Sequence, residues 1–277
     1  MTTEKVSFPG STGARLAGVL HLPEGQPLGS VLLAHCFTCS KDLHTLTRLA
    51  RGLTAAGYGV LRFDFTGIGD SGGSFADKTV TRNVADLVAA ARLLLERGFG
   101  PCAMVGHSLG GAATLVAARQ LHTVRSVIVV GAPSSPAHVR GLIAGSEAQI
   151  RSTGTAEVEI GGRQFPISAA FLDDLERHEQ EAHVAQLRRP LLVLHAVDDE
   201  VVPISEAEAN FAAASQPKAF WPLLDTDHLV SSRAAAERLL AAVTLWLTGT
   251  LGQNASPAQE GAPDRSGAAD LPGTADR

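Results

Sequence analysis

The chain has 277 residues, of which 45% are hydrophobic and 18% charged, and its formal net charge is −5 at pH 7. This composition is typical of a globular protein and too apolar for a wholly disordered chain. Dedicated nucleic-acid binders carry a basic excess, and a membrane span needs about 20 apolar residues in a row. We therefore expect no nucleic-acid partner and no membrane partner, and the length allows one or two domains.

The first residues and the cysteines predict a cytoplasmic protein. Residues 1–10 lack the basic and apolar regions of a secretory signal. Three cysteines, Cys36, Cys39 and Cys102, are too few for a disulfide framework. Cys36 and Cys39 form a C-x-x-C pair, which we interpret as two small residues in a turn after a strand. A redox-active pair or half of a metal site are the alternatives. Because no second pair stands at ligand spacing, we expect no metal.

Hydrophobic periodicity predicts a hairpin followed by alternating strands and helices. Two extended runs, Lys5–Pro9 and Arg15–Leu22, flank a turn at residues 10–13. Beyond it, continuous apolar runs of the kind found in buried strands alternate with apolar residues at helical spacing. The predicted strands are Ser30–His35, Gly59–Phe63, Cys102–Gly106, Val127–Gly131, Leu191–His195 and Ala219–Leu223. The predicted helices are Leu46–Ala56, Val80–Arg97, Leu109–Gln120, Ser205–Ala214 and Arg233–Leu247.

This alternation predicts an α/β fold with a mostly parallel sheet and helices on both faces. It is interrupted by a stretch for which we predict a helix over Pro136–Ile150, a short hairpin around Gly161 and Gly162, and a charged helix over about 168–187. Together these form a small cap insert at about 134–187 within a single domain of residues 1–250. Residues 251–277 are rich in Ala, Gly and Pro and almost free of large apolar residues, which predicts a disordered tail.

The segment 106–110 reads G-H-S-L-G and stands between a predicted strand and a predicted helix. In that context G-x-S-x-G indicates a nucleophile elbow, a sharp turn that exposes Ser108. A serine hydroxyl needs a base, and in enzymes built around such an elbow an acid and then a histidine follow the serine along the chain. His228 is the only histidine after His195, so chain order selects it as the base. Asp198 and Asp199 both follow a predicted strand, and both fit the acid by position.

A negative charge develops on the attacked carbonyl oxygen, and backbone N–H groups must receive it. One donor is expected from Leu109, the residue after the nucleophile, and the second from the loop after the first long strand. We predict that this second donor is the N–H of Phe37. In the insert, apolar residues are available for a substrate pocket, among which we select Phe171 and Leu172.

These motifs make the chain resemble the α/β-hydrolase superfamily over about residues 1–250. Residues 195–203 resemble its H-G-x-x-D-x-x-V-P segment, which aligns the acid with Asp199, and Asp227-His228 resembles the D-H segment that bears the base. Residues 35–42, H-C-F-T-C-S-K-D, are similar to the hydrolase half of bacterial proteins that fuse an α/β-hydrolase to an OsmC-like domain. The chain departs from those fusions in ending with a low-complexity tail.

We therefore expect a serine hydrolase that acts on acyl bonds, above all in small to medium carboxylic esters, through Ser108, His228 and Asp199. The partner would be a small-molecule acyl substrate, and no cofactor is implied. A thioesterase, amidase or peptidase with the same triad is an alternative. A non-catalytic binding protein of the same fold and a redox protein that uses Cys36 and Cys39 are the others. The sequence leaves the oligomeric state open.

Overall fold

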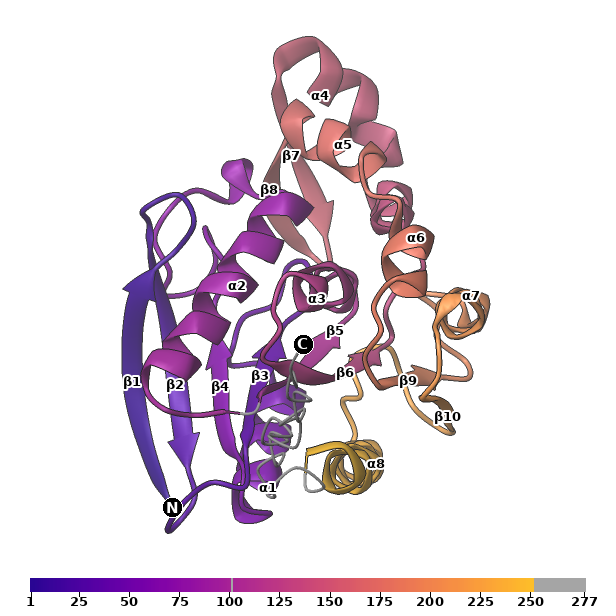
Figure 1. The fold of residues 1–277 in the computed structure, drawn as a ribbon. Coiled ribbons are helices and arrows are strands. Elements are labelled where there is room, and N and C mark those ends of the chain that lie inside the picture. The colour runs from indigo at the N-terminus through magenta and orange to yellow at the C-terminus, as the bar shows by residue number, and fades with distance from the viewer. Residues whose placement is uncertain (101, 252–277) are drawn as a thin grey trace, which may run out of the picture.

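A computed structural model describes residues 1–100 and 102–251. The predicted tail lies outside the described residues, apart from Leu251, which ends the last helix. An eight-stranded sheet, in the order β1-β2-β4-β3-β5-β6-β9-β10, forms the centre of this part of the chain (Figure 1). Its strands are β1 (Thr2–Pro9), β2 (Arg15–Leu22), β3 (Ser30–Ala34), β4 (Gly59–Phe63), β5 (Cys102–His107), β6 (Val124–Val130), β9 (Leu191–Ala196) and β10 (Lys218–Leu223).

Pairing in the sheet confirms the predicted α/β architecture. The N-terminal hairpin β1–β2 is antiparallel, and β2 also pairs antiparallel with β4. Every other neighbouring pair is parallel. The carboxyl ends of the parallel strands therefore meet at one edge, where ligands and reactive residues gather in such sheets.

Helices cover both faces of the sheet, as predicted (Figure 1). One face packs against α1 (His44–Ala55) and α8 (Arg233–Leu251), and the other packs against α2 (Val80–Glu96), α3 (Leu109–Arg119) and α7 (Ile204–Ala213). Alternate strand residues feed the two cores, since Val31 and Leu33 lie in one and Leu32 in the other. This period of two is the geometry of a strand that is buried on both sides.

The insert between β6 and β9 differs from its prediction. The single helix predicted over Pro136–Ile150 is wrong, because the chain there forms two 3₁₀ turns and a short helix. The predicted charged helix is also wrong, since it is interrupted between residues 176 and 180. The insert contains η2 (Pro136–Leu142), η3 (Ala144–Ser146), α4 (Glu147–Thr153), β7 (Thr155–Ile160), β8 (Arg163–Ser168), α5 (Ala169–Glu176) and α6 (Gln180–Ala185). Gly141 lies in η2 and Gly145 in η3, and glycine lowers the stability of a continuous α-helix.

The insert is held to the rest of the domain through its hairpin and α5. Strand β8 packs on the short turn η1 (Phe75–Asp77). The Asp174 carboxylate on α5 accepts hydrogen bonds from the Thr81 N–H, at 3.0 Å, and from the Thr81 hydroxyl, at 2.5 Å. Thr81 stands in the first turn of α2, so the insert is fixed to a helix that packs directly on the sheet.

None of the helices within residues 1–100 and 102–251 is long and apolar enough to cross a membrane.

Candidate active site

Ser108 stands in the sharp turn between β5 and α3. Its backbone has a φ of +54°, in the left-handed region that few residues other than glycine adopt. A Cβ on Gly110 would lie 2.1 Å from the carbonyl oxygen of His35, and a Cβ on Gly106 would lie 2.6 Å from the Cα of Gly111. Only glycine fits at these two positions. The turn therefore brings α3 against the end of β3 and leaves Ser108 half-buried at the helix N-terminus.

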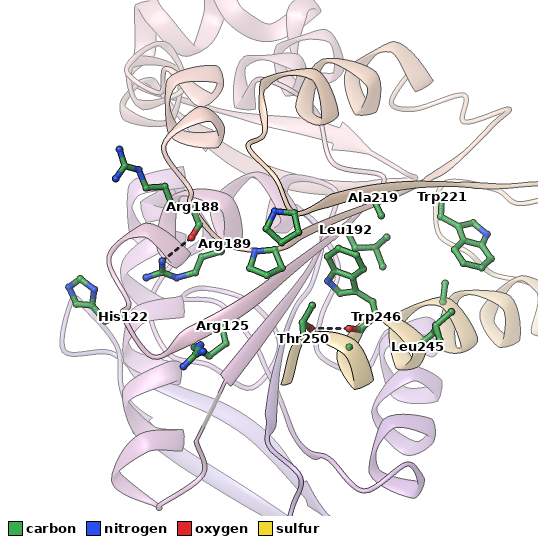
Figure 2. A pocket seen from close by; sticks show the side chains of 14 residues that line it. His122, Arg125, Arg188, Arg189, Leu192, Ala219, Trp221, Leu245, Trp246 and Thr250 are labelled. Atoms are coloured by element: carbon green, nitrogen blue, oxygen red, sulfur yellow. Dashed lines mark hydrogen bonds between the residues drawn. The ribbon is translucent and has the colours of Figure 1, made fainter. Parts of the chain in front are cut away.

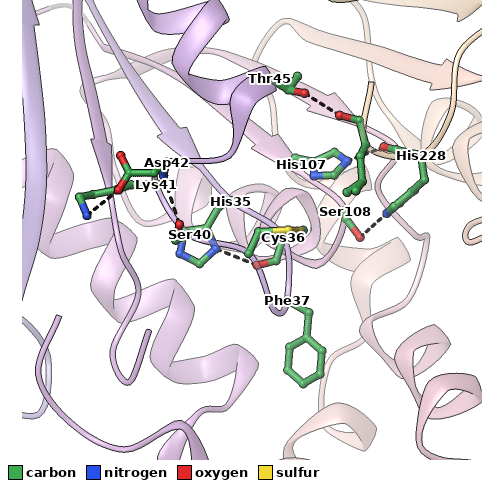
Figure 3. Close-up of a disulfide and its surroundings, with 12 residues drawn as sticks. His35, Cys36, Phe37, Ser40, Lys41, Asp42, Thr45, His107, Ser108 and His228 are labelled. Atoms are coloured by element: carbon green, nitrogen blue, oxygen red, sulfur yellow. Dashed lines mark hydrogen bonds and ion pairs between the residues drawn. A yellow bond between two sulfur atoms is a disulfide. The ribbon is translucent and has the colours of Figure 1, made fainter. Parts of the chain in front are cut away.

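The structure brings Ser108, His228 and Asp199 together in one hydrogen-bonded chain. Ser108 Oγ lies 3.0 Å from His228 Nε2 (Figure 3). His228 Nδ1 lies 2.7 Å from Asp199 Oδ2. The other oxygen of Asp199 accepts hydrogen bonds from the backbone N–H groups of Val201 and Val202, at 2.9 and 2.8 Å. Burial would raise the pKa of Asp199, but the hydrogen bonds from His228 and from these N–H groups outweigh burial and hold the pKa below its ordinary value.

The fold also decides between Asp198 and Asp199, which both fit the acid by their position in the sequence. The Asp199 carboxylate has no exposed surface, whereas Asp198 is exposed. Asp199 is therefore the carboxylate that contacts His228, in agreement with the resemblance to the α/β-hydrolase segment.

His228 is fixed by contacts with elements far away in the sequence. The hydroxyl of Thr45 on α1 donates to the carbonyls of Leu229, at 2.6 Å, and Val230, at 3.1 Å. His107 Nε2 lies 2.8 Å from the His228 carbonyl. Burial, aided by the neighbouring His228, lowers the pKa of His107 to about 4, so its ring is neutral at pH 7 and donates through Nε2–H.

The loop after β3 carries Phe37, one of the two predicted oxyanion donors, and hydrogen bonds of His35 fix the conformation of this loop. His35 Nδ1–H donates to the Cys36 carbonyl at 2.7 Å, and His35 Nε2 accepts from the Phe65 N–H at 3.1 Å. In a trans peptide the N–H points away from the C=O, so this bond orients the Phe37 N–H. Within residues 1–100 and 102–251, neither the Phe37 N–H nor the Leu109 N–H donates to a protein acceptor. Both remain free to bind an oxyanion.

The far end of this loop is anchored by a buried lysine. Lys41 Nζ forms ion pairs with Asp64 at 2.8 Å, Asp70 at 2.6 Å and Asp42 at 3.1 Å. Burial would lower the pKa of Lys41, but these hydrogen bonds raise it above its ordinary value, so the ammonium stays charged. The loop is thus held at both ends.

Cys36 and Cys39 form a disulfide across the middle of the same loop, with their Cα atoms 5.3 Å apart (Figure 3). The two cysteines lie in a turn after a strand, as predicted, but the prediction did not include a bond between them. Phe37 is one of the two residues that the disulfide encloses. The third cysteine, Cys102, is a buried thiol.

The two predicted pocket residues lie at different places relative to the site. The ring of Phe171, on α5, is stacked on the ring of Phe37, with 5.0 Å between centroids and 11° between planes. Both side chains are buried in the same core, with 2% of Phe171 and none of Leu172 exposed. Of the two, only Phe171 stacks on a residue of the oxyanion loop in the described part of the chain.

A separate cavity of about 970 Å³ lies at the amino ends of β9 and β10, away from the carboxyl ends that carry the triad. Figure 2 shows arginines on one side of it and tryptophans on the other; the labelled residues include Arg125, Arg188, Arg189, Trp221 and Trp246. In the described part of the chain, no group of three or more His, Cys, Asp or Glu residues is placed to hold a metal ion.

Sequence reasoning missed three residues that position the site: Thr45, His107 and Lys41. A signal existed for two of them, because His107 lies within the G-x-S-x-G segment and Lys41 within the H-C-F-T-C-S-K-D segment. Thr45 acts through contacts with Leu229 and Val230, which are distant in the chain, and no local pattern records such contacts.

A serine on a strand–turn–helix elbow, hydrogen-bonded through a histidine to a buried carboxylate above a mostly parallel sheet, defines a hydrolase-type fold and site. The chain belongs to the alpha/beta hydrolase family, whose model matches residues 31–265. The closer likeness to OsmC-like fusion proteins stays a prediction.

Three similar proteins carry named activities. The esterase domain of a Rhodothermus marinus protein is 40% identical, with a TM-score of 0.75, and the match covers 91% of this chain and 100% of that one. Monoacylglycerol lipase of Mycolicibacterium smegmatis is 24% identical, covering 74% of this chain and 82% of that protein. Mouse mitochondrial palmitoyl-protein thioesterase ABHD10 is 29% identical, covering 53% of this chain and 50% of that protein.

Proposed function

We propose that the protein is a serine hydrolase that cleaves carboxylic esters through an acyl-enzyme. The observation that carries this proposal is the chain of hydrogen bonds from Ser108 Oγ through His228 to the buried Asp199. A serine becomes a nucleophile when an adjacent base takes its proton, and the base must be oriented by a third group. Each of these requirements has its residue here.

In the proposed mechanism Ser108 Oγ attacks the ester carbonyl while His228 Nε2 takes the hydroxyl proton. Asp199 stabilises the resulting imidazolium. The N–H groups of Phe37 and Leu109 bind the oxyanion of the tetrahedral intermediate, and loss of one such donor typically costs about 2.7–4 kcal/mol of transition-state stabilisation. The imidazolium then protonates the leaving alcohol. A water molecule, deprotonated by His228, hydrolyses the acyl-enzyme and restores Ser108.

The relatives support an ester as the substrate and give a reason to keep a second candidate. The esterase domain and the monoacylglycerol lipase favour carboxylic esters. The palmitoyl-protein thioesterase favours thioesters, which the same triad would attack in the same way. We further propose that Phe171 contacts the acyl group, because its ring already lies against the oxyanion loop, and that Leu172 supports it. The proposal also includes a cytoplasmic location.

Turnover of p-nitrophenyl esters of increasing acyl length tests this function. We expect hydrolysis by the natural chain, a rate that depends on acyl length, and loss of turnover in Ser108→Ala without loss of the fold. Ser152→Ala, an exposed serine on α4, is the matched control and should keep full activity. Unchanged hydrolysis in Ser108→Ala would reject the assigned nucleophile.

Two further measurements separate the alternatives. A fluorophosphonate probe should label Ser108 in the natural chain and fail to label Ser108→Ala, whereas a non-catalytic binding protein would not be labelled at all. The same acyl chain offered as an ester and as a thioester decides between the two hydrolase classes through the ratio of their kcat/KM values.

A further inference from the structure

Lys78 is a buried lysine that forms no ion pair with any residue in the described part of the chain. It follows η1, two residues before the start of α2, and only 2% of its surface is exposed. Its Nζ donates to the Phe37 carbonyl at 2.5 Å. The rings of Phe37, Phe65 and Phe75 surround Nζ, at 5.1, 5.6 and 5.3 Å from their centroids. Within residues 1–100 and 102–251, no carboxylate forms an ion pair with it. Burying such a charge is costly, and that cost calls for a role.

The charged groups around Lys78 do little to offset this cost. Burial lowers the pKa of Lys78 to about 7, and the negative charge of Asp86, on α2, opposes this only in part. His35, after β3, is the other titratable neighbour, and its pKa falls to about 3 through burial and the nearby Lys78, so it is neutral. The parts of β8 and α5 that line the same gap contribute only Pro166, Ile167, Ser168 and Phe171, none of which titrates.

Lys41, which anchors the far end of the same loop, can be compared with Lys78. It is as buried as Lys78, with 5% of its surface exposed, but it pairs with three carboxylates. Lys78 instead places its ammonium on a single carbonyl, which belongs to the residue whose N–H is the proposed oxyanion donor. Lys41 therefore anchors the loop through ion pairs, whereas Lys78 contacts the backbone of Phe37 itself.

We propose that Lys78 is a positioning residue for the oxyanion site, which fixes the peptide that follows Phe37 and strengthens the Phe37 N–H as a donor. The inference rests on the proposed esterase function. His35 holds the carbonyl before Phe37 and Lys78 holds the carbonyl after it, so both peptide planes that flank the Phe37 Cα are fixed. A positive charge next to this donor favours the anionic transition state over the neutral ester, so it acts on kcat rather than on binding.

Lys78→Met tests the inference because methionine keeps the length of the side chain and removes both the donor and the charge. We expect kcat for a p-nitrophenyl ester to fall roughly tenfold to a hundredfold at pH 6, with little change in KM. The melting temperature should stay the same or rise, since an unpaired buried cation is removed.

The pH profile is the readout that a merely structural role would not move. Lys78 is charged below its pKa of about 7 and loses that charge as the pH rises. The ratio of natural to Lys78→Met kcat should therefore be largest at pH 6 and decline to a smaller plateau by pH 9. Lys78→Gln, which retains a neutral donor, should keep part of the rate and lose the decline. It also serves if the methionine variant does not fold.

Lys218 offers a matched control. It also donates to a carbonyl, that of Phe211 at 2.7 Å, and its Nζ lies 4.6 Å from the Phe211 ring, but it starts β10 at the opposite end of the strands. Lys218→Met should leave kcat and its pH profile unchanged. Natural kcat and an unchanged pH profile in the folded Lys78 variants would overturn the inference. Absence of turnover in the natural chain would instead reject the proposed function, so the two failures are distinguishable.

Discussion

The ring of Phe37 lies nearly parallel to the ring of Phe171, and this stack joins the oxyanion loop to the insert. Aromatic pairs of this kind contribute about 0.5–1.5 kcal/mol beyond the area that they bury. The conformation of the insert and the conformation of the loop are therefore linked through two side chains.

Phe171→Leu should weaken this link, because leucine fills much of the volume but cannot stack. We expect the free energy of unfolding to fall by about 1 kcal/mol and kcat to fall severalfold, as measured by urea denaturation and ester turnover. Phe211→Leu is the control, since Phe211 packs against Phe220, with centroids 6.1 Å apart, away from the site. If both variants lose stability and neither loses activity, the stack does not support catalysis.

Asp199→Asn should lower kcat by about 10⁴-fold, because an asparagine in this position favours the wrong tautomer of the histidine. Asp198→Asn should leave kcat almost unchanged, because the Asp198 side chain is exposed and Asp199 is the carboxylate that contacts His228. Steady-state turnover of one ester by the two variants measures the difference directly. The reverse order of effects would reassign the acid to Asp198.

Gly110→Ala should disturb the nucleophile and the oxyanion loop in one step. Its new methyl group would meet the His35 carbonyl oxygen at 2.1 Å, so either α3 or the end of β3 must shift. We expect a lower melting temperature and little turnover. Gly145→Ala, where no atom lies within 4 Å of the added methyl group, should preserve both. Normal turnover in Gly110→Ala would show that the backbone around His35 can shift to accept the methyl group without displacing Ser108 or the oxyanion loop.

Reduction of the Cys36–Cys39 disulfide should lower kcat only modestly, by less than about tenfold. A dithiol such as dithiothreitol supplies two electrons and two protons, yields two thiols and is itself oxidised to a disulfide. The loop then keeps its other supports, the bonds from His35, Lys41 and Lys78. Thiol titration and turnover before and after reduction provide the test, with the Cys36→Ala/Cys39→Ala double variant as a control. Complete loss of turnover on reduction would show instead that the disulfide is required.

Asp174 should make the attachment of the insert depend on pH. Burial would raise the pKa of Asp174, but hydrogen bonds from His178 and Thr81 lower it to about 2 from its ordinary value of 3.8. A carboxyl group whose pKa falls on folding stabilises the protein above its unfolded-state pKa, and this stabilisation is lost as the pH falls toward the folded-state value. In Asp174→Asn we expect a loss of about 2 kcal/mol at pH 7. Urea denaturation should show the difference shrinking between about pH 4 and pH 2, and a difference independent of pH would contradict this assignment.

Local patterns were sufficient for most of the fold and for the nucleophile. The strands and helices around the sheet have strong periodicity, and G-x-S-x-G between a strand and a helix places Ser108 in its turn. The choice between Asp198 and Asp199 required the fold. It depends on which carboxylate contacts His228 and accepts hydrogen bonds from the N–H groups of Val201 and Val202.

The insert and Lys78 lay beyond local patterns for physical reasons. In the insert, glycines and packing against the domain outweigh weak helical periodicity, so two predicted helices are broken into shorter pieces. Lys78 reads as an ordinary polar residue before a helix. Its role arises because Phe37, Phe65 and Phe75, from separate segments, surround it only in the folded chain.

The support of His228 by Thr45 and His107 has a consequence for the order in which the protein gains activity. The base lies after the last strand of the sheet, and its loop is held by side chains that are synthesised 121 and more residues earlier. The relay of Ser108, His228 and Asp199 is therefore incomplete until the segment that carries His228 has packed against the rest of the domain. Ester turnover during refolding should therefore appear last, after the secondary structure has formed, and would report the docking of the C-terminal part of the chain onto the rest.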